Sequence, residues 1–444
     1  MKKLSLPLAV AIGLGTLAQQ ASAAGFIEDS KATLGLRNFY YNRNDVNTAD
    51  NASEAAEWGQ AFMLNYSSGF TEGTVGFGLD AVGLLGLKLD GGGDGDSSDD
   101  YSRKPGQLFP TESNGKARDE YSKLGVTAKV RISKTEGRIG TLRPMLPVVL
   151  SNDGRLLPQM YEGGQITSNE FDNLTLIGGQ LEHAVARSSS DETGLRIASN
   201  DSKKPNNFES KFYYAGADYQ ITKDLKAQYY YGNLEEFYKQ HFLGLVHNLA
   251  IGSGSLKTDL RYFHSTSDGK NSNGEAGYIS KGYWHTGDAH TGEVDNDTWS
   301  AMFTYSLSGH ALSLGYQQVE GRSDFPFLNQ GDGSDAYLFT NRQIGKFLSA
   351  GERSWQAEYA YDFANLGVPG LKASASYTSG DNIKAADGDR KEWERDFRVD
   401  YVLQEGSLKG LGFTWRNGML RSNVKGTNDT NENRLIVSYT LPLL

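Results

Sequence analysis

The sequence predicts an all-β fold, an 18-stranded antiparallel transmembrane β-barrel, and three observations support this prediction. Apolar and polar residues alternate along many segments of about ten residues, which is the pattern of a strand with one apolar face. Short tight connections alternate with long polar ones. The 444-residue chain is rich in Gly, Tyr and Phe, and no linker or compositional step divides it into several domains.

The N-terminal residues have the three parts of a secretory signal peptide. Met1–Lys3 is basic, residues 4–18 are mostly apolar, and Ala21–Ala23 supplies the small residues of a cleavage site. The apolar run is too short and too glycine-rich for a membrane-spanning helix. We therefore predict a cleaved signal peptide over residues 1–23 and a single β-barrel domain over residues 24–444.

Composition excludes several classes of function. The chain has no Cys, which excludes a disulfide framework and metal sites with Cys ligands. Lys and Arg total 44 against 54 Asp and Glu, and removing Lys2 and Lys3 with the signal leaves 42 against 54, a net charge near −12. This acidic balance disfavours nucleic-acid binding.

The alternation is clearest in the segment nearest the C-terminus. Leu435, Val437 and Tyr439 fall on one face, whereas Arg434 and Ser438 fall on the other. A period of two residues is the period of a β-strand. The same pattern occurs in residues 126–133, 298–307, 354–363, 396–403 and 411–419.

The connections fall into two classes that alternate along the chain. Eight short ones are expected near residues 68–72, 133–137, 169–173, 221–225, 250–254, 307–310, 364–370 and 404–409. Nine others are expected near residues 44–57, 88–120, 141–163, 183–208, 232–237, 264–296, 319–352, 379–393 and 422–430, and all of these except 232–237 are long. Eight turns and nine loops join eighteen strands.

Such a sheet could form soluble sandwiches or a closed membrane barrel. Strands of about ten residues, aromatic residues near strand ends and the alternation of short turns with long loops favour the barrel. Closure leaves no unpaired strand edge in hydrocarbon. Both termini are then periplasmic, and eighteen strands leave an aqueous lumen rather than one filled by side chains.

Residue parity predicts which charges face that lumen. Arg37 and Arg43 lie opposite the apolar face of the first strand, and Arg398, Arg416 and Arg434 do so on the last three. Because the last strands close onto the first, these arginines form one stripe that attracts anions. Parity also turns Lys129, Arg131 and Arg261 inward, together with the acids Glu358, Asp362, Asp396 and Asp400. These acids leave neutralisation of the stripe as an open alternative.

Signals for catalysis or metal binding are weak. The segment Asp90–Asp100 is acidic but lacks the spacing and terminal Glu of an EF-hand, so a flexible surface loop is favoured over a calcium site. None of the seven His stands beside a Ser or Asp in a pattern that marks a nucleophile. We predict no catalytic residue, no metal site and no cofactor, with an outer-membrane barrel hydrolase as the alternative from another class.

Several segments go beyond the general pattern of a barrel, namely Gly25–Ser30, Leu36–Arg43, Gly73–Asp80, Lys129–Lys134, Asn365–Gly370 and Asn433–Val437. These segments resemble the OprD family of outer-membrane carboxylate-selective porins, and the resemblance runs over residues 25–444. Segments closer to the OpdK-like branch of that family are residues 151–159, Tyr238–Phe242 and Gly254–Tyr262.

The resemblance implies a barrel, monomeric or weakly trimeric, in which loop three folds into the pore and forms a constriction with loop seven. It also implies that Asp153 in loop three and Asp324 in loop seven lie at that constriction. A path of arginines leads through it, matched here to Arg37, Arg43, Arg131, Arg155, Arg187, Arg416 and Arg434.

The expected function is therefore transport rather than catalysis. The chain resembles a substrate-selective porin of the Gram-negative outer membrane for passive uptake of small carboxylates, with cyclic or aromatic monocarboxylates favoured. Thr414 stands where OprD carries a further arginine, which disfavours the alternative of basic amino acids and peptides. A structural or adhesive barrel with a filled lumen is a further alternative. The expected partners are small organic anions and the lipid and lipopolysaccharide of the membrane, with no nucleic acid.

Overall fold

The computed structural model describes residues 24–46, 54–92, 105–198, 207–285, 287–288, 291–329 and 333–444. The predicted signal peptide at residues 1–23 lies outside the described residues, as do residues 93–100 of the acidic segment. Among the described residues, no helix is long and apolar enough to cross a membrane.

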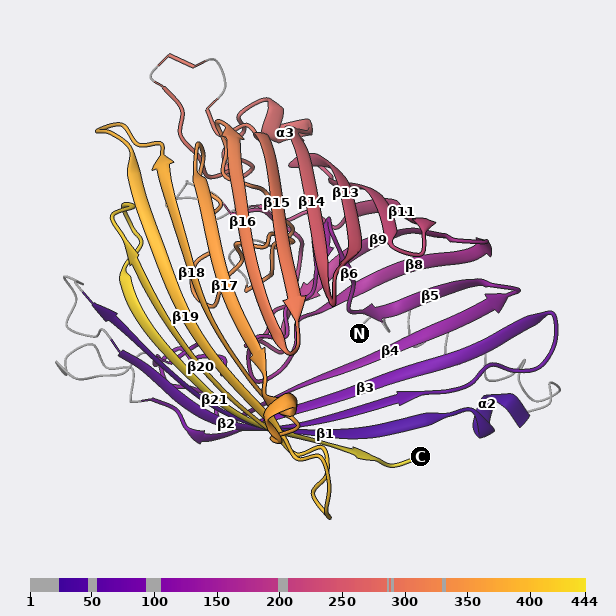
Figure 1. Ribbon diagram of the computed structural model, residues 1–444. Helices are drawn as coiled ribbons and strands as arrows, with labels where there is room; N and C mark the ends of the chain where they lie inside the picture. Colours follow the sequence, from indigo (N-terminus) through magenta and orange to yellow (C-terminus); the bar gives the residue numbers. More distant parts are fainter. Residues whose placement is uncertain are drawn as a thin grey trace.

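Eighteen antiparallel strands form one closed ring (Figure 1), which confirms the predicted fold class and strand number. The strands are β1 (Lys31–Val46), β2 (Glu54–Ser67), β3 (Val75–Asp90), β4 (Glu120–Ile132), β5 (Thr135–Leu142), β8 (Met160–Phe171), β9 (Leu174–Val185), β11 (Phe212–Thr222), β12 (Leu225–Leu234), β13 (Tyr238–Ile251), β14 (Gly254–Ser267), β15 (Asp295–Leu307), β16 (His310–Gly321), β17 (Arg353–Asp362), β18 (Leu371–Ile383), β19 (Arg390–Val402), β20 (Gly412–Ser422) and β21 (Asp429–Pro442).

Minor elements belong to the connections. The hairpin of β6 (Met145–Leu146) and β7 (Val149–Leu150) forms a separate two-stranded sheet. The short strand β10 (Glu192–Thr193) pairs with the last two residues of β9. The short helices are α2 (Ala24–Glu28), α3 (Gly269–Ser272) and η1 (Phe363–Leu366).

The first and last barrel strands close the ring. β1 pairs with β21 from Thr33 opposite Pro442 to Val46 opposite Asp429. Every barrel strand therefore has a partner on each side, although some pairings cover only part of a strand, as between β4 and β5. Unpaired backbone groups cost several kcal/mol each in hydrocarbon, so closure is what allows this sheet to stand in a membrane.

Side-chain alternation separates an apolar outer face from a polar inner face. On β21, Leu435 is 49% exposed and its neighbour Arg434 only 5%. Trp415 on β20 and Trp355 on β17 are likewise exposed on the outside. The parity argument thus assigned the two faces of these strands correctly, because a strand cannot shift by one residue without reversing both faces.

Turns lie at one end of the ring and loops at the other, as predicted. We number the loops in chain order and use four of them below. These are L3 (residues 143–159), L4 (186–211), L6 (268–294) and L7 (322–352).

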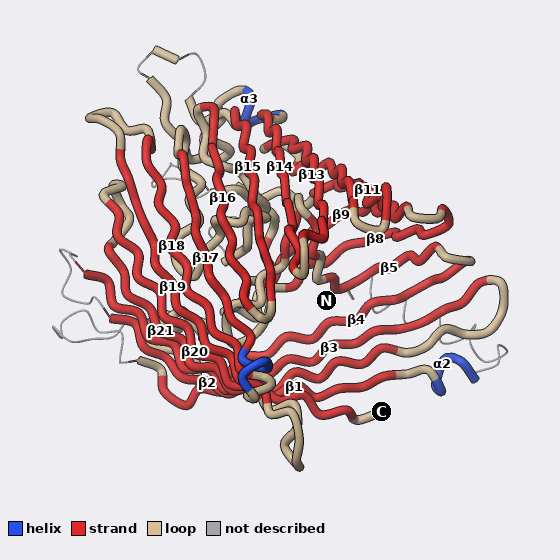
Figure 2. Tube along the Cα trace, viewed as in Figure 1, coloured by secondary structure: helices blue, strands red, loops and turns tan. Residues whose placement is uncertain are grey.

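Two of these loops fold into the ring, where Figure 2 shows coil segments crossing its interior. The tip of L3 packs on one side through Leu156 and Leu157, which join a buried cluster with Phe39 and Phe109. L7 packs on the other side through Phe325, which joins a second cluster. Each fully buried side chain of this size contributes about 1.5–3 kcal/mol, so both loops are fixed to the wall by apolar contact.

Candidate functional site

The tip of L3, residues 151–159, is held by its own polar groups. The Asn152 carboxamide oxygen accepts a hydrogen bond from the Gly154 N–H at 2.7 Å, which makes a local turn. The Gln159 N–H donates to the Asn152 carbonyl at 2.8 Å and closes the tip. Leu156 and Leu157, which lie between these two residues in the chain, are buried in the cluster with Phe39 and Phe109. Arg155 beside them lines the cavity in the lumen.

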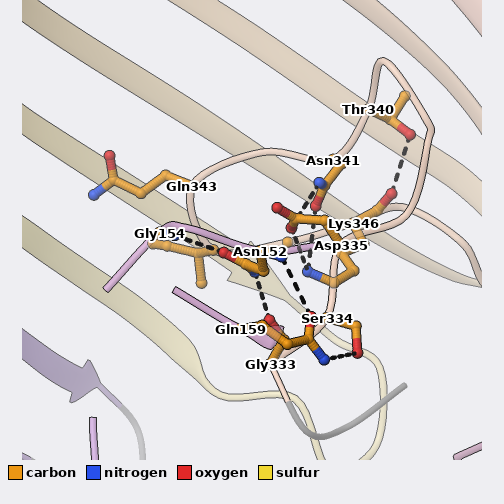
Figure 3. Close-up of polar contacts among 12 residues, drawn as sticks. Asn152, Gly154, Gln159, Gly333, Ser334, Asp335, Thr340, Asn341, Gln343 and Lys346 are labelled. Atoms are coloured by element: carbon orange, nitrogen blue, oxygen red, sulfur yellow. Dashed lines mark hydrogen bonds and ion pairs between the residues drawn. The ribbon is translucent and has the colours of Figure 1, made fainter. Parts of the chain in front are cut away.

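L3 and L7 are joined directly (Figure 3). Asn152 donates to the Gly333 carbonyl at 2.5 Å, Gln159 donates to Ser334 at 3.4 Å, and Leu150 forms a bridge with Asp335. Gly333 has a φ of +81°, and a Cβ there would lie 2.5 Å from Nε of Arg187 in L4. A glycine is therefore what lets three loops meet at this point.

The wall strands also hold L3 in place. Arg37 on β1 donates two hydrogen bonds to the Asp153 carboxylate, at 2.8 and 2.9 Å, and a third to the Arg155 carbonyl. On β4, Lys123 donates from Nζ to the carbonyls of Pro158, Ala186 and Arg187. The structure thus brings the predicted residues Arg37 and Asp153 together as an anchor of the loop.

The space between L3, L7 and the wall is a cavity of about 480 Å³. Its lining contains more basic than acidic side chains. The basic residues are Arg155, Arg187, Arg342, Lys346, Arg398, Arg416 and Arg434, and the acidic ones are Asp335, Glu358 and Asp396.

Three of these arginines form a row across neighbouring strands. Arg398 on β19 lies directly opposite Arg416 on β20, and Arg416 lies opposite Arg434 on β21. Like charges in directly opposite positions destabilise a sheet. Asp400 and Glu432 offset the charges of Arg398 and Arg434, so the repulsion within the row falls mainly on Arg416.

The arginines of the cavity differ in whether they have a counter-ion. Arg398 pairs with Asp400, Arg434 with Glu432, and Arg342 with Glu358 and Asp396. Within the described part of the chain, no carboxylate lies within ion-pair distance of three others, Arg155, Arg187 and Arg416. Nε of Arg416 has no hydrogen-bond partner there at all.

Arg155 lies over a buried network that fixes its surroundings. Its guanidinium sits 4.7 Å from the ring centre of Tyr41, whose hydroxyl donates to Glu432 at 2.7 Å. Arg434 pairs with the same carboxylate at 2.6 Å and donates to the Gln343 carbonyl of L7 at 2.7 Å.

Burial, and then the charge of Arg434, lower the pKa of Arg155. Burial, and then the charges of Arg155 and Arg434, also lower the pKa of Arg187. The lowered values mean that these positive charges are held against repulsion and desolvation.

The other predicted positions lie apart from this cavity. Arg43, near the loop end of β1, pairs with Asp45 at 2.7 Å. Arg131, near the turn end of β4, stacks 4.1 Å from the ring centre of Phe70. Asp324 accepts a hydrogen bond from the Ala350 N–H at the base of L7 and does not line the cavity.

Sequence reasoning missed Arg342 and Lys346 as lining residues. Both lie in L7, where residue parity gives no information because the backbone is irregular. Parity assigned Arg398 to the inner face but not to the site. Its position opposite Arg416 depends on the strand register, which the sequence does not give.

Two buried acids at the base of L7, Asp324 and Glu352, predict that the packing of this loop depends on pH. Burial raises the pKa of Asp324 to about 6. Burial, followed by the charge of Glu392, raises the pKa of Glu352. A raised pKa means that the protonated acid favours the packed loop, and that this contribution is lost as the pH rises through the raised value. The charged groups that face Asp324 are Lys281 of L6, Glu352 of L7 and Glu392 of β19.

We expect L7 to loosen as the pH rises from 5 to 8, seen as more frequent current fluctuations in single-channel recordings. Asp324→Asn should reduce this dependence because an amide cannot ionise, and the part that Glu352 contributes should remain. Asp389→Asn, which alters an exposed acid bound to Lys384, is the matched control and should behave as the parent. Full pH dependence in Asp324→Asn would contradict the assignment.

No group of three or more His, Asp or Glu residues in the described ranges is arranged to hold a metal ion. The residues that converge in the cavity are cationic donors rather than metal ligands. What the arrangement can do chemically is bind an anion through several N–H donors at once.

Comparison with known proteins gives consistent matches over nearly the whole chain. A family model described as outer membrane porin, OprD family, matches residues 24–443. The crystal structure of Pseudomonas aeruginosa OccK8 (OprE) has 56% sequence identity and a TM-score of 0.86, covering 95% of this chain and 100% of that chain. That of Pseudomonas aeruginosa OpdK with vanillate has 34% identity and a TM-score of 0.81, covering 94% and 100%. The porin-like protein GalP of Pseudomonas putida is 35% identical, over 97% of this chain and 96% of its own length.

Proposed function

We propose that this chain, which belongs to the OprD family of outer membrane porins, selects small organic carboxylates at the cavity between L3 and L7. Membership of the family, with the closed barrel, makes the chain a substrate-specific channel of the Gram-negative outer membrane. The substrate class is the part that we infer from the geometry.

One observation carries the proposal. Arg155 of L3, Arg187 of L4 and Arg416 of β20 approach one cavity from three elements, and none of them has a carboxylate partner among the described residues. A guanidinium binds a carboxylate through two parallel N–H donors. A carboxylate that enters the cavity would supply the counter-ion that the protein does not.

The acids of the cavity argue against basic amino acids as the preferred substrate. Glu358 and Asp396 are both bound by Arg342, at 3.4 and 3.0 Å. Asp335 accepts a hydrogen bond from Asn341 at 2.9 Å and lies 3.9 Å from Lys346. A cationic substrate would have to displace these partners, whereas an anionic one meets free donors.

We further propose that ring-bearing monocarboxylates are favoured. The flat face of a guanidinium stacks on an aromatic ring while its edge binds a carboxylate. The 34% identical OpdK was crystallised with vanillate, which supports a ring-bearing acid as substrate. Arg37, Arg43 and Arg131 would extend the path, with Arg43 toward the loop end and Arg131 toward the turn end.

Reversal potentials in planar bilayers test the carboxylate proposal. Under a salt gradient we expect anion preference, and we expect millimolar benzoate to reduce the chloride current by competing for the arginines. A liposome uptake panel of benzoate, butyrate and arginine should rank them in that order. Cation preference, or a chloride current unaffected by benzoate, would overturn the proposal, and faster uptake of arginine would favour the basic-amino-acid alternative.

A further inference from the structure

The outer wall has a polar surface that transport does not use. It lies on the outside of β19, β20, β21 and β1, on the loop side of an aromatic row. In that row Trp415 is opposite Leu435, Leu435 is opposite Tyr40, and Tyr40 is opposite Trp58. Aromatic rows of this kind mark the membrane–water boundary of an outer-membrane barrel.

Amides form the next outward row toward the loops. Asn417 is opposite Asn433, and Asn433 is opposite Asn42. Asn417 donates to the Asn433 carboxamide oxygen at 3.0 Å. Their strand neighbours Arg416 and Arg434 line the lumen cavity, so these amides face outward.

Two arginines stand above the amides. Arg395 on β19 is opposite Met419, and Arg421 is two residues further along β20, so the two are diagonal neighbours within reach of one ligand. Arg395 lies between Glu394 and Asp396, which are both buried on the lumen side. Because successive side chains of a strand point to opposite faces, Arg395 faces outward. The Arg421 position is about 20 Å along the strand from Trp415. It lies directly opposite Trp393 of β19, which stacks on Tyr377.

The two arginines differ in how many of their donors the described chain already uses. Arg395 makes one hydrogen bond of 3.4 Å to Asn417, and its guanidinium lies 4.8 Å from the ring centre of Phe397. Its Nε is buried without a partner, and it has no ion pair among the described residues.

Arg421 donates from Nη1 to the carbonyls of Leu420 and Thr430 and from Nη2 to Asn431 at 2.9 Å. The Asp429 carboxylate lies 3.9 Å from its Nε. Glu54, at the start of the neighbouring β2, accepts a hydrogen bond from Asn42. The donors left for a ligand are therefore mainly the terminal nitrogens of Arg395, and Arg421 adds positive charge beside them on a surface that also presents amides.

We propose that this surface binds a phosphorylated glycolipid of the outer leaflet. Arg395 and Arg421 bind a phosphate of its headgroup, and Asn417 and Asn433 bind sugar hydroxyls. Arginine matches the geometry of phosphate oxygens, and amides can both donate to and accept from hydroxyls. A second copy of the chain is a poorer fit, because a two-fold contact would bring the same basic side chains face to face.

The proposal rests on the outer-membrane location and not on the transported substrate, so the two fail separately. Binding of purified bisphosphorylated lipid A to the full-length protein in detergent, followed by native mass spectrometry, tests it. Arg395→Gln/Arg421→Gln should weaken lipid A binding about tenfold or more, the effect of losing charge-assisted contacts. Arg353→Gln, which removes an exposed arginine paired with Asp381, is the matched control and should bind as the parent.

Further measurements test whether phosphate is required and whether another ligand or a second copy of the chain occupies the surface. Monophosphorylated lipid A should bind the parent more weakly than the bisphosphorylated form, and inorganic phosphate should not compete at millimolar concentration. A heat-dependent shift in gel migration should be unchanged in the double variant, because both side chains lie outside the packed lumen. Equal lipid A binding by parent and double variant would overturn the proposal. So would competition by inorganic phosphate alone, or a change in oligomer size without a change in lipid binding.

Discussion

Replacing Arg155 with glutamine is expected to lower carboxylate flux about tenfold and to shift the reversal potential toward cations. A hydrogen bond to a charged group contributes about 1.5–3 kcal/mol, and among the described residues Arg155 has no carboxylate partner with which a substrate must compete. The substitution leaves no acid unpaired, because Glu432 keeps both Arg434 and Tyr41. The barrel should therefore fold and resist heat as well as the parent.

The control for this prediction is Arg322→Gln. Arg322 is the first residue of L7. It pairs with Asp295 of β15 at 2.8 Å and does not line the cavity. Its removal should change neither flux nor reversal potential. Arg187→Gln and Arg416→Gln should move both quantities in the same direction as Arg155→Gln. Wild-type benzoate uptake by Arg155→Gln in liposomes would remove Arg155 from the proposed path.

Breaking the Glu432–Arg434 pair is expected to have the largest effect on stability. The two side chains are 2% and 5% exposed, and Arg434 also joins L7 to the wall through Gln343. Arg434→Met leaves Glu432 buried with Tyr41 as its remaining partner. Removing one member of a buried pair costs about 3–5 kcal/mol, so the temperature at which the folded band shifts on a gel should fall clearly.

A double variant separates the charge from the packing. Arg434→Met/Glu432→Leu removes both charges and should recover much of the lost heat resistance, while its anion preference stays below that of the parent. Lys372→Met, which breaks an exposed pair with Asp362, should cost only about 0–1 kcal/mol. Heat resistance of Arg434→Met equal to the parent, or a double variant no better than the single one, would show that the pair does not hold the constriction.

The sequence alone determined the barrel and the two faces of its wall. A strand period of two residues reports directly on which side chains face water and which face lipid. The positions of Arg37, Arg416 and Arg434 within their alternating segments were therefore enough to assign them to the lumen. The order of short and long connections fixed the strand number, because each connection joins two neighbouring strands in an antiparallel ring.

The site itself was decided by tertiary structure. Arg155, Arg187, Arg342 and Lys346 lie in loops, whose irregular backbone has no period that relates sequence position to direction. The resemblance placed Asp153 at a constriction, but only the folded loop shows its carboxylate bound to Arg37 while remaining 58% exposed. Which arginines keep a free charge depends on contacts between residues far apart in the chain. Such contacts arise only when L3 and L7 pack against each other inside the closed wall.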